Sequence, residues 1–237
     1  MAGMRGLGNM KSEVAKPNTC PYDLWRPGRV DYALALTMQQ QRVETLLTRG
    51  GPNLLLLLEH PPVYTMGRSG KREEVLAMPP GHAPVPLILT DRGGRVTYHG
   101  PGQLVVYVIR DLRPDTGRVL DHVRRLEAVV LATLTAFGIQ GMRESGNPGV
   151  WVAGEKIAAL GVRIRRGITY HGIAINRDVD LTPYTGIIPC GLQGRGVTSL
   201  ERLGCRVSET VLQEEVLRAF CEVFAAHLTE IFPEIVT

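Results

Sequence analysis

Apolar residues recur at helical spacing in three stretches of the sequence, and this pattern predicts three amphipathic helices. They cover residues 32–47, residues 118–137, and a last segment whose apolar stripe includes Val211, Leu212, Val216, Phe220 and Phe224. Asp31 and Ser208 are suitable N-caps for the first and third helices, and Gly50 and Gly138 follow the first and second. Each helix is therefore expected to pack one face against a core.

Short apolar runs bounded by glycine or proline predict strands between these helices. They lie at residues 53–59, 63–66, 85–90, 104–109, 150–152, 156–164 and 168–175. Several strands follow one another directly, and the order lacks a regular alternation of strand and helix. The pattern therefore favours a mixed or largely antiparallel sheet flanked by helices, in the α+β class.

The composition is that of an ordinary globular domain, with 237 residues, 44% hydrophobic and 21% charged. We expect a flexible N-terminal tail over residues 1–16 and one domain over residues 17–237. The longest apolar run, residues 54–58, is too short to cross a bilayer, and the chain does not open with a secretory signal pattern. These features predict a cytoplasmic protein that does not bind membranes.

The formal net charge of +4 is a mild bias. It is too small to indicate a nucleic-acid partner, although it favours an acidic one. The four cysteines form no C-x-x-C pair and have no zinc-site spacing, and no H-x-x-x-H pair occurs. We therefore predict reduced thiols and no metal site.

A glycine-rich string, RGGRVTYHGPGQ, runs from Arg92 to Gln103 between two predicted strands. Its glycines would let backbone amides approach a ligand, although an ordinary hairpin loop has the same composition and is about equally probable on that basis. The string lacks the G-K-S or G-K-T ending of a phosphate-binding loop and the G-x-G-x-x-G spacing of a dinucleotide site. Nucleotide binding is therefore not supported.

Cys190 is the cysteine placed as a nucleophile would be, in a rigid turn between Pro189 and Gly191. The alternative is a small buried hydrophobic residue, which is what most free cysteines are. Cys20 and Cys221 fit that alternative.

Lys156 is followed by an apolar run, residues 157–160, which would remove water from its amine and suit a proton acceptor beside a thiol. A solvated lysine at a strand edge is the more common alternative. His99 and His171, each followed by glycine, are candidates for lining a pocket, although hydrogen-bonded loop histidines are equally consistent with the sequence.

The motifs RGGRVTYHGPGQL, GVWV with KIAALGVRIRRG, YHGIAIN, and IIPCGL with GVTSL resemble those of the lipoyl(octanoyl) transferases. The similarity extends from about residue 54 to about residue 200. It implies a single-domain fold similar to the biotin and lipoate protein ligases, with a mixed β-sheet flanked by helices. It also implies a Cys/Lys dyad formed by Cys190 and Lys156. The substrate-binding residues implied by the resemblance are Arg92, Gly93, Gly94, Arg95, Val96, Thr97, Tyr98, His99, Ala159, Leu160, Gly161, Gly172, Ile173 and Ala174.

The resemblance implies transfer of an octanoyl group from octanoyl-acyl carrier protein to a lysine of lipoyl domains, through a thioester on Cys190. The implied acceptors are the E2 subunits of 2-oxoacid dehydrogenases and the glycine cleavage H protein, and we expect a monomer without cofactors. Arg163, Arg165 and Arg166 are a candidate docking surface for acidic substrates or simply a solvated turn. Two alternatives stay open, an ATP-dependent lipoate ligase of the same fold and a binding module without turnover.

Overall fold

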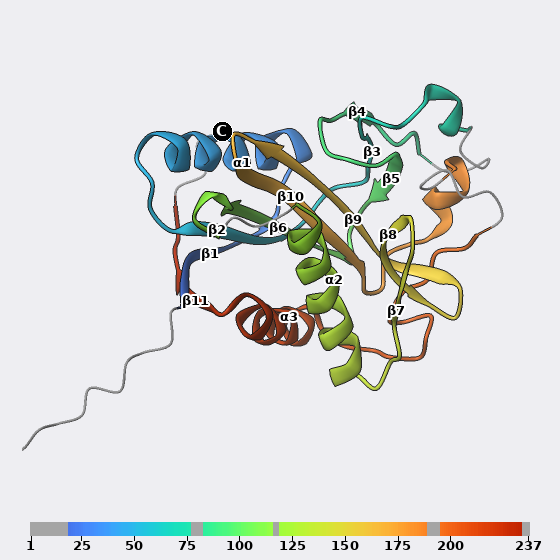
Figure 1. The fold of residues 1–237 in the computed structure, drawn as a ribbon. Helices are drawn as coiled ribbons and strands as arrows, with labels where there is room; N and C mark the ends of the chain where they lie inside the picture. Colours follow the sequence, from blue (N-terminus) through green and yellow to red (C-terminus); the bar gives the residue numbers. More distant parts are fainter. Residues whose placement is uncertain (1–18, 77–82, 116–118, 189–194, 234–237) are drawn as a thin grey trace, which may run out of the picture.

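A twisted eight-stranded sheet forms the centre of this computed structural model, which describes residues 19–76, 83–115, 119–188 and 195–233 (Figure 1). In spatial order its strands are β11 (Ala226–Glu230), β1 (Cys20–Arg29), β2 (Asn53–Glu59), β6 (Gln103–Asp111), β10 (Ile168–Asn176), β9 (Glu155–Arg165), β8 (Asn147–Val152) and β7 (Met142–Glu144). β1 pairs in parallel with β2 and β11, and the other neighbours are antiparallel. The predicted mixed sheet is confirmed.

A second, three-stranded sheet has the order β4 (Leu87–Leu89), β3 (Val63–Met66) and β5 (Val96–His99). The whole glycine-rich string was expected to be a connection between strands, and this is wrong for its middle part. β5 has little apolar pattern of its own, but it pairs antiparallel with β3 and is fully buried. The neighbouring strand thus supplies the hydrogen bonds that define β5.

The three predicted helices are present as α1 (Tyr32–Thr48), α2 (Val119–Ala136) and α3 (Glu209–Phe224), with 3₁₀ turns at Arg72–Glu74, Arg113–Asp115 and Thr182–Gly186. The Asp31 carboxylate accepts the backbone N–H of Ala33 at 2.8 Å, and Ser208 Oγ accepts that of Val211 at 3.2 Å, so both expected caps are formed. Val211, placed in the buried stripe of α3, is 47% exposed because it lies in the first turn of the helix, at the edge of the packed face.

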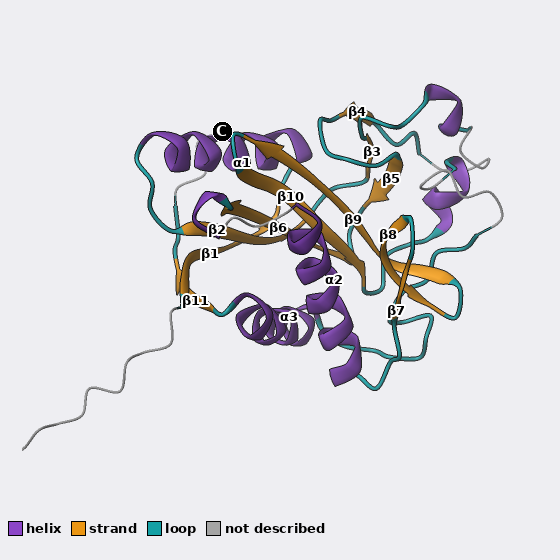
Figure 2. Ribbon diagram, viewed as in Figure 1, coloured by secondary structure: helices purple, strands orange, loops and turns teal. Residues whose placement is uncertain are grey.

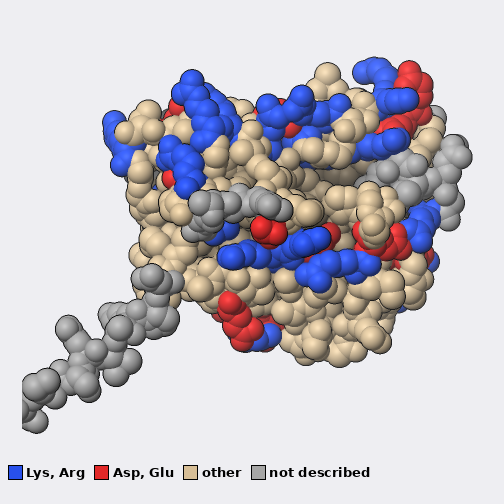
Figure 3. Space-filling view, in the orientation of Figure 1, with Lys and Arg blue, Asp and Glu red and all other residues tan. Residues whose placement is uncertain are grey.

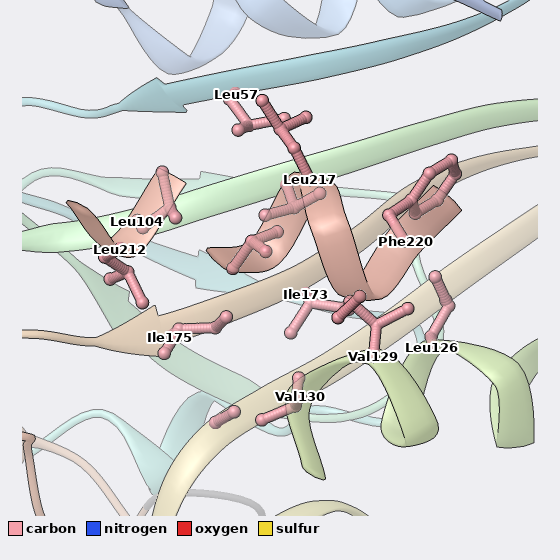
Figure 4. Packing of buried hydrophobic residues seen from close by; sticks show 14 of the residues in the cluster. Leu57, Leu104, Leu126, Val129, Val130, Ile173, Ile175, Leu212, Leu217 and Phe220 are labelled. Atoms are coloured by element: carbon pink, nitrogen blue, oxygen red, sulfur yellow. The ribbon is translucent and has the colours of Figure 1, made fainter. Parts of the chain in front are cut away.

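The helices cover the two faces of the main sheet differently (Figure 2). α2 and α3 pack on one face and enclose a large apolar cluster that includes Leu57, Leu126, Ile173 and Phe220 (Figure 4). α1 packs on the other face with its own cluster, which includes Leu56, Val105 and Ala174. No helix within the described ranges is long and apolar enough to cross a membrane.

Besides β5, three further strands were not predicted, namely β1, β7 and β11. β11 lies at the sheet edge and pairs only with β1 among the described strands. Cys20 opens β1, and its sulfur accepts a hydrogen bond from Asn53 Nδ2 at 3.1 Å. The predicted tail, residues 1–16, lies outside the residues that the structure describes.

Candidate active site

A pocket lies between the two sheets, closed at one side by α1, and we call it the inter-sheet pocket. Its empty volume is about 490 Å³, counting the part open to solvent. It is lined by Tyr32, Arg92, Gly94, Arg95, Val96, Thr97, His99, Val105, Tyr107, Ala159, Leu160, Gly161, His171, Gly172, Ile173 and Ala174. Aliphatic side chains and backbone form most of its wall.

The structure brings nearly all the predicted substrate-binding residues to this pocket, from β5, β9, β10 and the segment before β5. Two do not line it. Gly93 lines a neighbouring pocket described below. The Tyr98 ring points into the core of the small sheet, where its centroid lies 5.8 Å from that of Tyr64 and 5.6 Å from that of Tyr184.

Arg92 is a buried cation that holds the glycine-rich segment in place. Its Nη2 donates to the carbonyl of Thr65 at 2.7 Å, to the Thr65 hydroxyl at 2.8 Å and to the carbonyl of Arg95 at 2.8 Å. Its Nη1 donates to the carbonyl of Gly93 at 3.0 Å. These bonds tie residues 93–95 to β3, so the guanidinium shapes the pocket wall.

The glycine-rich segment also lies directly against β9. The N–H of Gly93 donates to the carbonyl of Val162 at 2.9 Å. A Cβ at Gly161 would stand 2.9 Å from the carbonyl oxygen of Gly93, so a side chain there would push the segment away from the strand. The thin pocket wall therefore depends on Gly161.

The polar groups at the inner end of the pocket are hydrogen-bonded to one another or to the backbone. His60 Nδ1 lies 2.7 Å from the carbonyl of Val30 and Nε2 lies 2.8 Å from Tyr107 Oη. His99 Nδ1 lies 2.7 Å from Gln103 Oε1, and His99 Nε2 lies 3.2 Å from the Thr65 hydroxyl oxygen. Burial lowers the pKa of His60 to about 4 and holds that of His99 well below its usual range. Both rings are therefore neutral near pH 7.

His171 lies at the α1 side of the pocket, where its Nε2 is 3.0 Å from the Asp91 carboxylate. Burial lowers the pKa of His171, although its bond to Asp91 offsets part of that effect, and the same bond is the main cause that lowers the pKa of Asp91 to about 2. No group of three His, Cys, Asp or Glu side chains in the described ranges is arranged to hold a metal ion.

Tyr32, Val105 and Tyr107 also line the pocket, and the sequence analysis does not identify them as site residues. A tyrosine such as Tyr107, in an otherwise aliphatic strand, is a weak signal of a polar lining. The sequence gives no comparable signal for Tyr32, because tyrosine is common at the start of an amphipathic helix.

Lys156 is nearly buried, with 6% of its surface exposed, so the solvated alternative is wrong. Its Nζ donates to the carbonyl of Pro148 at 3.2 Å and lies 4.7 Å from the centroid of the Trp151 ring. It lines a second hollow, the Lys156 pocket, which shares Gly94, Arg95, Leu160 and Gly161 with the inter-sheet pocket. The lysine amine thus lies in a chamber that adjoins the inter-sheet pocket.

The loop before β8 places the lysine amine. The buried Glu127 of α2 accepts the N–H of Gly149 at 3.2 Å, next to the Pro148 carbonyl that holds Nζ. A Cβ at Gly149 would lie 3.3 Å from Lys156 Cε and 2.6 Å from the carbonyl of Ala158. Gly149, whose φ is +132°, therefore leaves the room that Lys156 occupies.

Cys190 lies outside the described residues, so its distance from Lys156 is not defined. The chain that follows it is fixed to the lysine, because the backbone N–H of Lys156 donates to the carbonyl of Gly196 at 3.1 Å and its carbonyl accepts from Thr198 at 3.0 Å. Gly196 is 196 − 190 = 6 positions after Cys190.

Comparison with known sequences identifies the family. The family described as "Lipoyl protein ligase A/B catalytic domain" matches residues 31–225. The octanoyltransferase of Magnetococcus marinus is 49% identical over 74% of this chain and 81% of its own length. The octanoyltransferase of Nitrobacter winogradskyi is 38% identical over 95% of this chain and all of its own length.

Solved structures agree on the fold. The bi-partite lipoate protein ligase of Thermoplasma acidophilum superposes with a TM-score of 0.71 at 16% identity, over 91% of this chain and 89% of that chain. A lipoate-protein ligase A bound with ATP gives 0.64 at 15% identity, over 90% of each chain. These similarities confirm the predicted lipoate-ligase-like fold. With the sequence relatives, they show that this chain belongs to the octanoyltransferases, within the lipoyl protein ligase A/B catalytic domain family.

Proposed function

We propose that this protein transfers an octanoyl group from octanoyl-acyl carrier protein to a lysine of lipoyl domains, through a thioester on Cys190 with Lys156 as the proton-transfer partner. Its acceptors in this proposal are the lipoyl domains of 2-oxoacid dehydrogenase E2 subunits and the glycine cleavage H protein. Residues 17–237 act as one catalytic domain, and the enzyme works as a monomer.

The observation that carries this proposal is the position of Lys156. Its amine is nearly buried, is held by Pro148 and Trp151, and lies in a chamber that adjoins a largely aliphatic pocket. Such a position suits a proton donor and acceptor beside a carbonyl carbon whose hydrocarbon chain is buried.

In the first transfer, the Cys190 thiolate attacks the carbonyl carbon of the octanoyl thioester on the carrier protein. Lys156 takes the proton of the Cys190 thiol and returns it to the departing thiol of the carrier, as the C–S bond to the carrier breaks. The enzyme then holds the octanoyl group as a thioester.

In the second transfer, the amine of the acceptor lysine attacks the same carbonyl carbon. Lys156 accepts a proton from this amine and passes it to the sulfur of Cys190, which leaves as a thiol. The product is an amide, and the enzyme regains its starting state. Since a thioester is already activated, neither transfer requires ATP.

The inter-sheet pocket is the site for the hydrocarbon chain. Burial of about six methylene groups, at about 0.8 kcal/mol each, would contribute roughly 5 kcal/mol to binding. Val105 and Ala174, whose side chains lie on the α1 face of the main sheet, provide aliphatic contacts.

The alternative of an ATP-dependent lipoate ligase has less support. The ligases that superpose on this chain are 15–16% identical to it, which establishes a shared fold only. The relatives at 38–49% identity are octanoyltransferases.

Intact mass spectrometry after mixing the enzyme with octanoyl-acyl carrier protein tests the proposal. We expect a gain of one octanoyl group that hydroxylamine removes, and no gain for Cys190→Ala. Cys221→Ala is the matched control, because Cys221 is partly buried on α3 and burial raises the pKa of its thiol. Full transfer by Cys190→Ala in an ATP-dependent reaction would favour the ligase, and stable binding of the carrier without acylation would favour a binding module.

A further inference from the structure

A cleft at the molecular surface adjoins the Lys156 pocket. It lies between α2 and the hairpin formed by β7 and β8, and we call it the outer cleft. It shares Val123, Gly146, Asn147 and Pro148 with the Lys156 pocket, and its empty volume is about 840 Å³ including the part open to solvent. Three hollows therefore adjoin one another in sequence, namely the inter-sheet pocket, the Lys156 pocket and the outer cleft.

This order matters for an acyl thioester, which has a hydrocarbon chain on one side of its carbonyl and a thiol-bearing group on the other. If the hydrocarbon occupies the inter-sheet pocket and the carbonyl lies near Lys156, the thiol-bearing group must leave by another opening. The outer cleft begins at Pro148, whose carbonyl lies 3.2 Å from Lys156 Nζ, so it starts next to the reacting centre.

The charges of the outer cleft indicate what its far end would bind. Glu127 is paired with Arg143 at 3.1 Å, and Glu144 is paired with Arg195, so both carboxylates are neutralised. Arg124 also lines the cleft, is exposed, and has no acidic partner among the residues that the structure describes. Figure 3 shows a short row of arginine and lysine side chains near the middle of this face, with some acidic side chains beside it. The far end of the cleft thus favours an anion.

We propose that the outer cleft binds the phosphopantetheine arm of the acyl donor, with Arg124 facing the phosphate. The inference rests on the proposed function, which supplies the carrier protein as donor. The arm fits by its chemistry, because it is linear, carries its thiol at one end and its phosphate at the other, and has amides between them that suit a wall of mixed polar and apolar groups.

Competition with two small molecules tests this assignment. The rate at which octanoyl-acyl carrier protein acylates the enzyme is measured in the presence of free phosphopantetheine or of pantetheine, which lacks the phosphate. We expect phosphopantetheine to inhibit at about a tenfold lower concentration, as one charge-assisted contact would give. Arg124→Glu should abolish this difference and slow acylation by the carrier. Arg49→Glu is the matched control, because Arg49 is also exposed but ends α1 on the opposite face of the sheet, and it should keep the difference.

Equal inhibition by the two molecules in the unmodified enzyme, or a preference that survives Arg124→Glu, would overturn the assignment. The second transfer tests whether the cleft binds the acceptor, a lipoyl domain, in place of the arm of the donor. Enzyme that already carries the octanoyl group is mixed with a lipoyl domain, and Arg124→Glu should leave this step unchanged. Selective slowing of this step would assign the cleft to the acceptor instead. Absence of acylation in the unmodified enzyme would reject the proposed function itself.

Discussion

The two faces of the main sheet bury different kinds of side chain. Under α2 and α3 the cluster is aliphatic and aromatic, with members such as Leu126 and Phe220 fully buried, although Glu127 and His122 of α2 are also buried there. Under α1 and the small sheet, the interior also holds Arg92, His60 and His99, each hydrogen-bonded to side chains or backbone. Apolar burial stabilises the first face, whereas polar contacts on the second fix the shape of a pocket.

This difference has a physical consequence. An apolar cluster tolerates small shifts because dispersion contacts are not directional, whereas a buried polar group costs free energy unless its partners are well placed. The pocket is thus built on the face where geometry is most strictly fixed. Substitutions at the pocket should therefore change mainly the transfer reaction, whereas substitutions in the apolar core should change mainly the free energy of unfolding.

Removal of the lysine amine should have the largest effect on activity. We expect Lys156→Met to lower the rate of octanoyl transfer by about 100-fold or more, as is typical for loss of a proton-transfer group. The free energy of unfolding should change little, because methionine keeps most of the apolar stem. Single-turnover kinetics and urea unfolding measure the two effects, and a normal transfer rate would remove Lys156 from the mechanism.

A substitution in the apolar core under α2 should show the opposite pattern. We expect Leu126→Ala, at a fully buried position of α2, to lower the free energy of unfolding by about 2–5 kcal/mol. The transfer rate per folded molecule should stay close to normal. A large loss of activity at full folding would mean that this part of the core also determines the geometry of the reacting groups.

A third prediction concerns His122, a buried histidine on the apolar face. Burial lowers the pKa of His122 to about 3, with the charges of Arg110 and Arg125 adding to the effect, and neither ring nitrogen has a hydrogen-bond partner in the described part of the chain. The unfolded histidine takes up a proton near pH 6.5, but the folded one does not until about pH 3. Stability from the neutral ring is therefore present above pH 6.5 and lost as the pH falls from 6.5 toward 3.

His122→Leu should remove this loss. We compare the free energies of unfolding of the variant and the unmodified protein in urea at pH 7 and at pH 5. Between these pH values, the difference should shift in favour of the variant by about 2 kcal/mol. His60→Leu is the matched comparison from the polar face, since it should also destabilise the protein at pH 7 by removing two hydrogen bonds. An unchanged pH dependence in His122→Leu would mean that the ring is protonated in the folded state.

The smallest expected effect is a change in acyl-chain preference, and it compares two alanines on the adjacent strands β10 and β9. Ala174 lines the inter-sheet pocket, whereas Ala158 belongs to the apolar cluster on the other face. The extra methyl groups of Ala174→Val should displace about two methylenes of the acyl chain, worth about 1.5 kcal/mol. We expect the preference for octanoyl over hexanoyl donors, measured as a ratio of kcat/KM, to fall about tenfold.

Ala158→Val serves as the control, because overpacking on the apolar face should affect stability and leave the chain-length ratio unchanged. Equal ratios in the two variants would mean that the inter-sheet pocket does not hold the hydrocarbon chain.

The family motifs in the sequence predicted nearly all the residues that meet at the pocket, and the strongly patterned helices and strands were also predicted. α1 and β2 are examples, since a capped apolar periodicity and a run of five leucines specify their conformation locally. The apolar neighbours of Lys156 in the sequence agree with its burial in the structure, although its partners Pro148 and Trp151 were not predicted.

Only the tertiary structure decided which polar segments become strands and which way several side chains point. β5 and β11 are strands because neighbouring strands supply their hydrogen bonds, and no local pattern specifies such pairing. Likewise, the sequence by itself placed Tyr98 and Arg92 together among the substrate-binding residues. The fold directs the Tyr98 ring into the small-sheet core and surrounds the Arg92 guanidinium with carbonyls, because side-chain orientation follows from strand pairing and packing between segments distant in the chain.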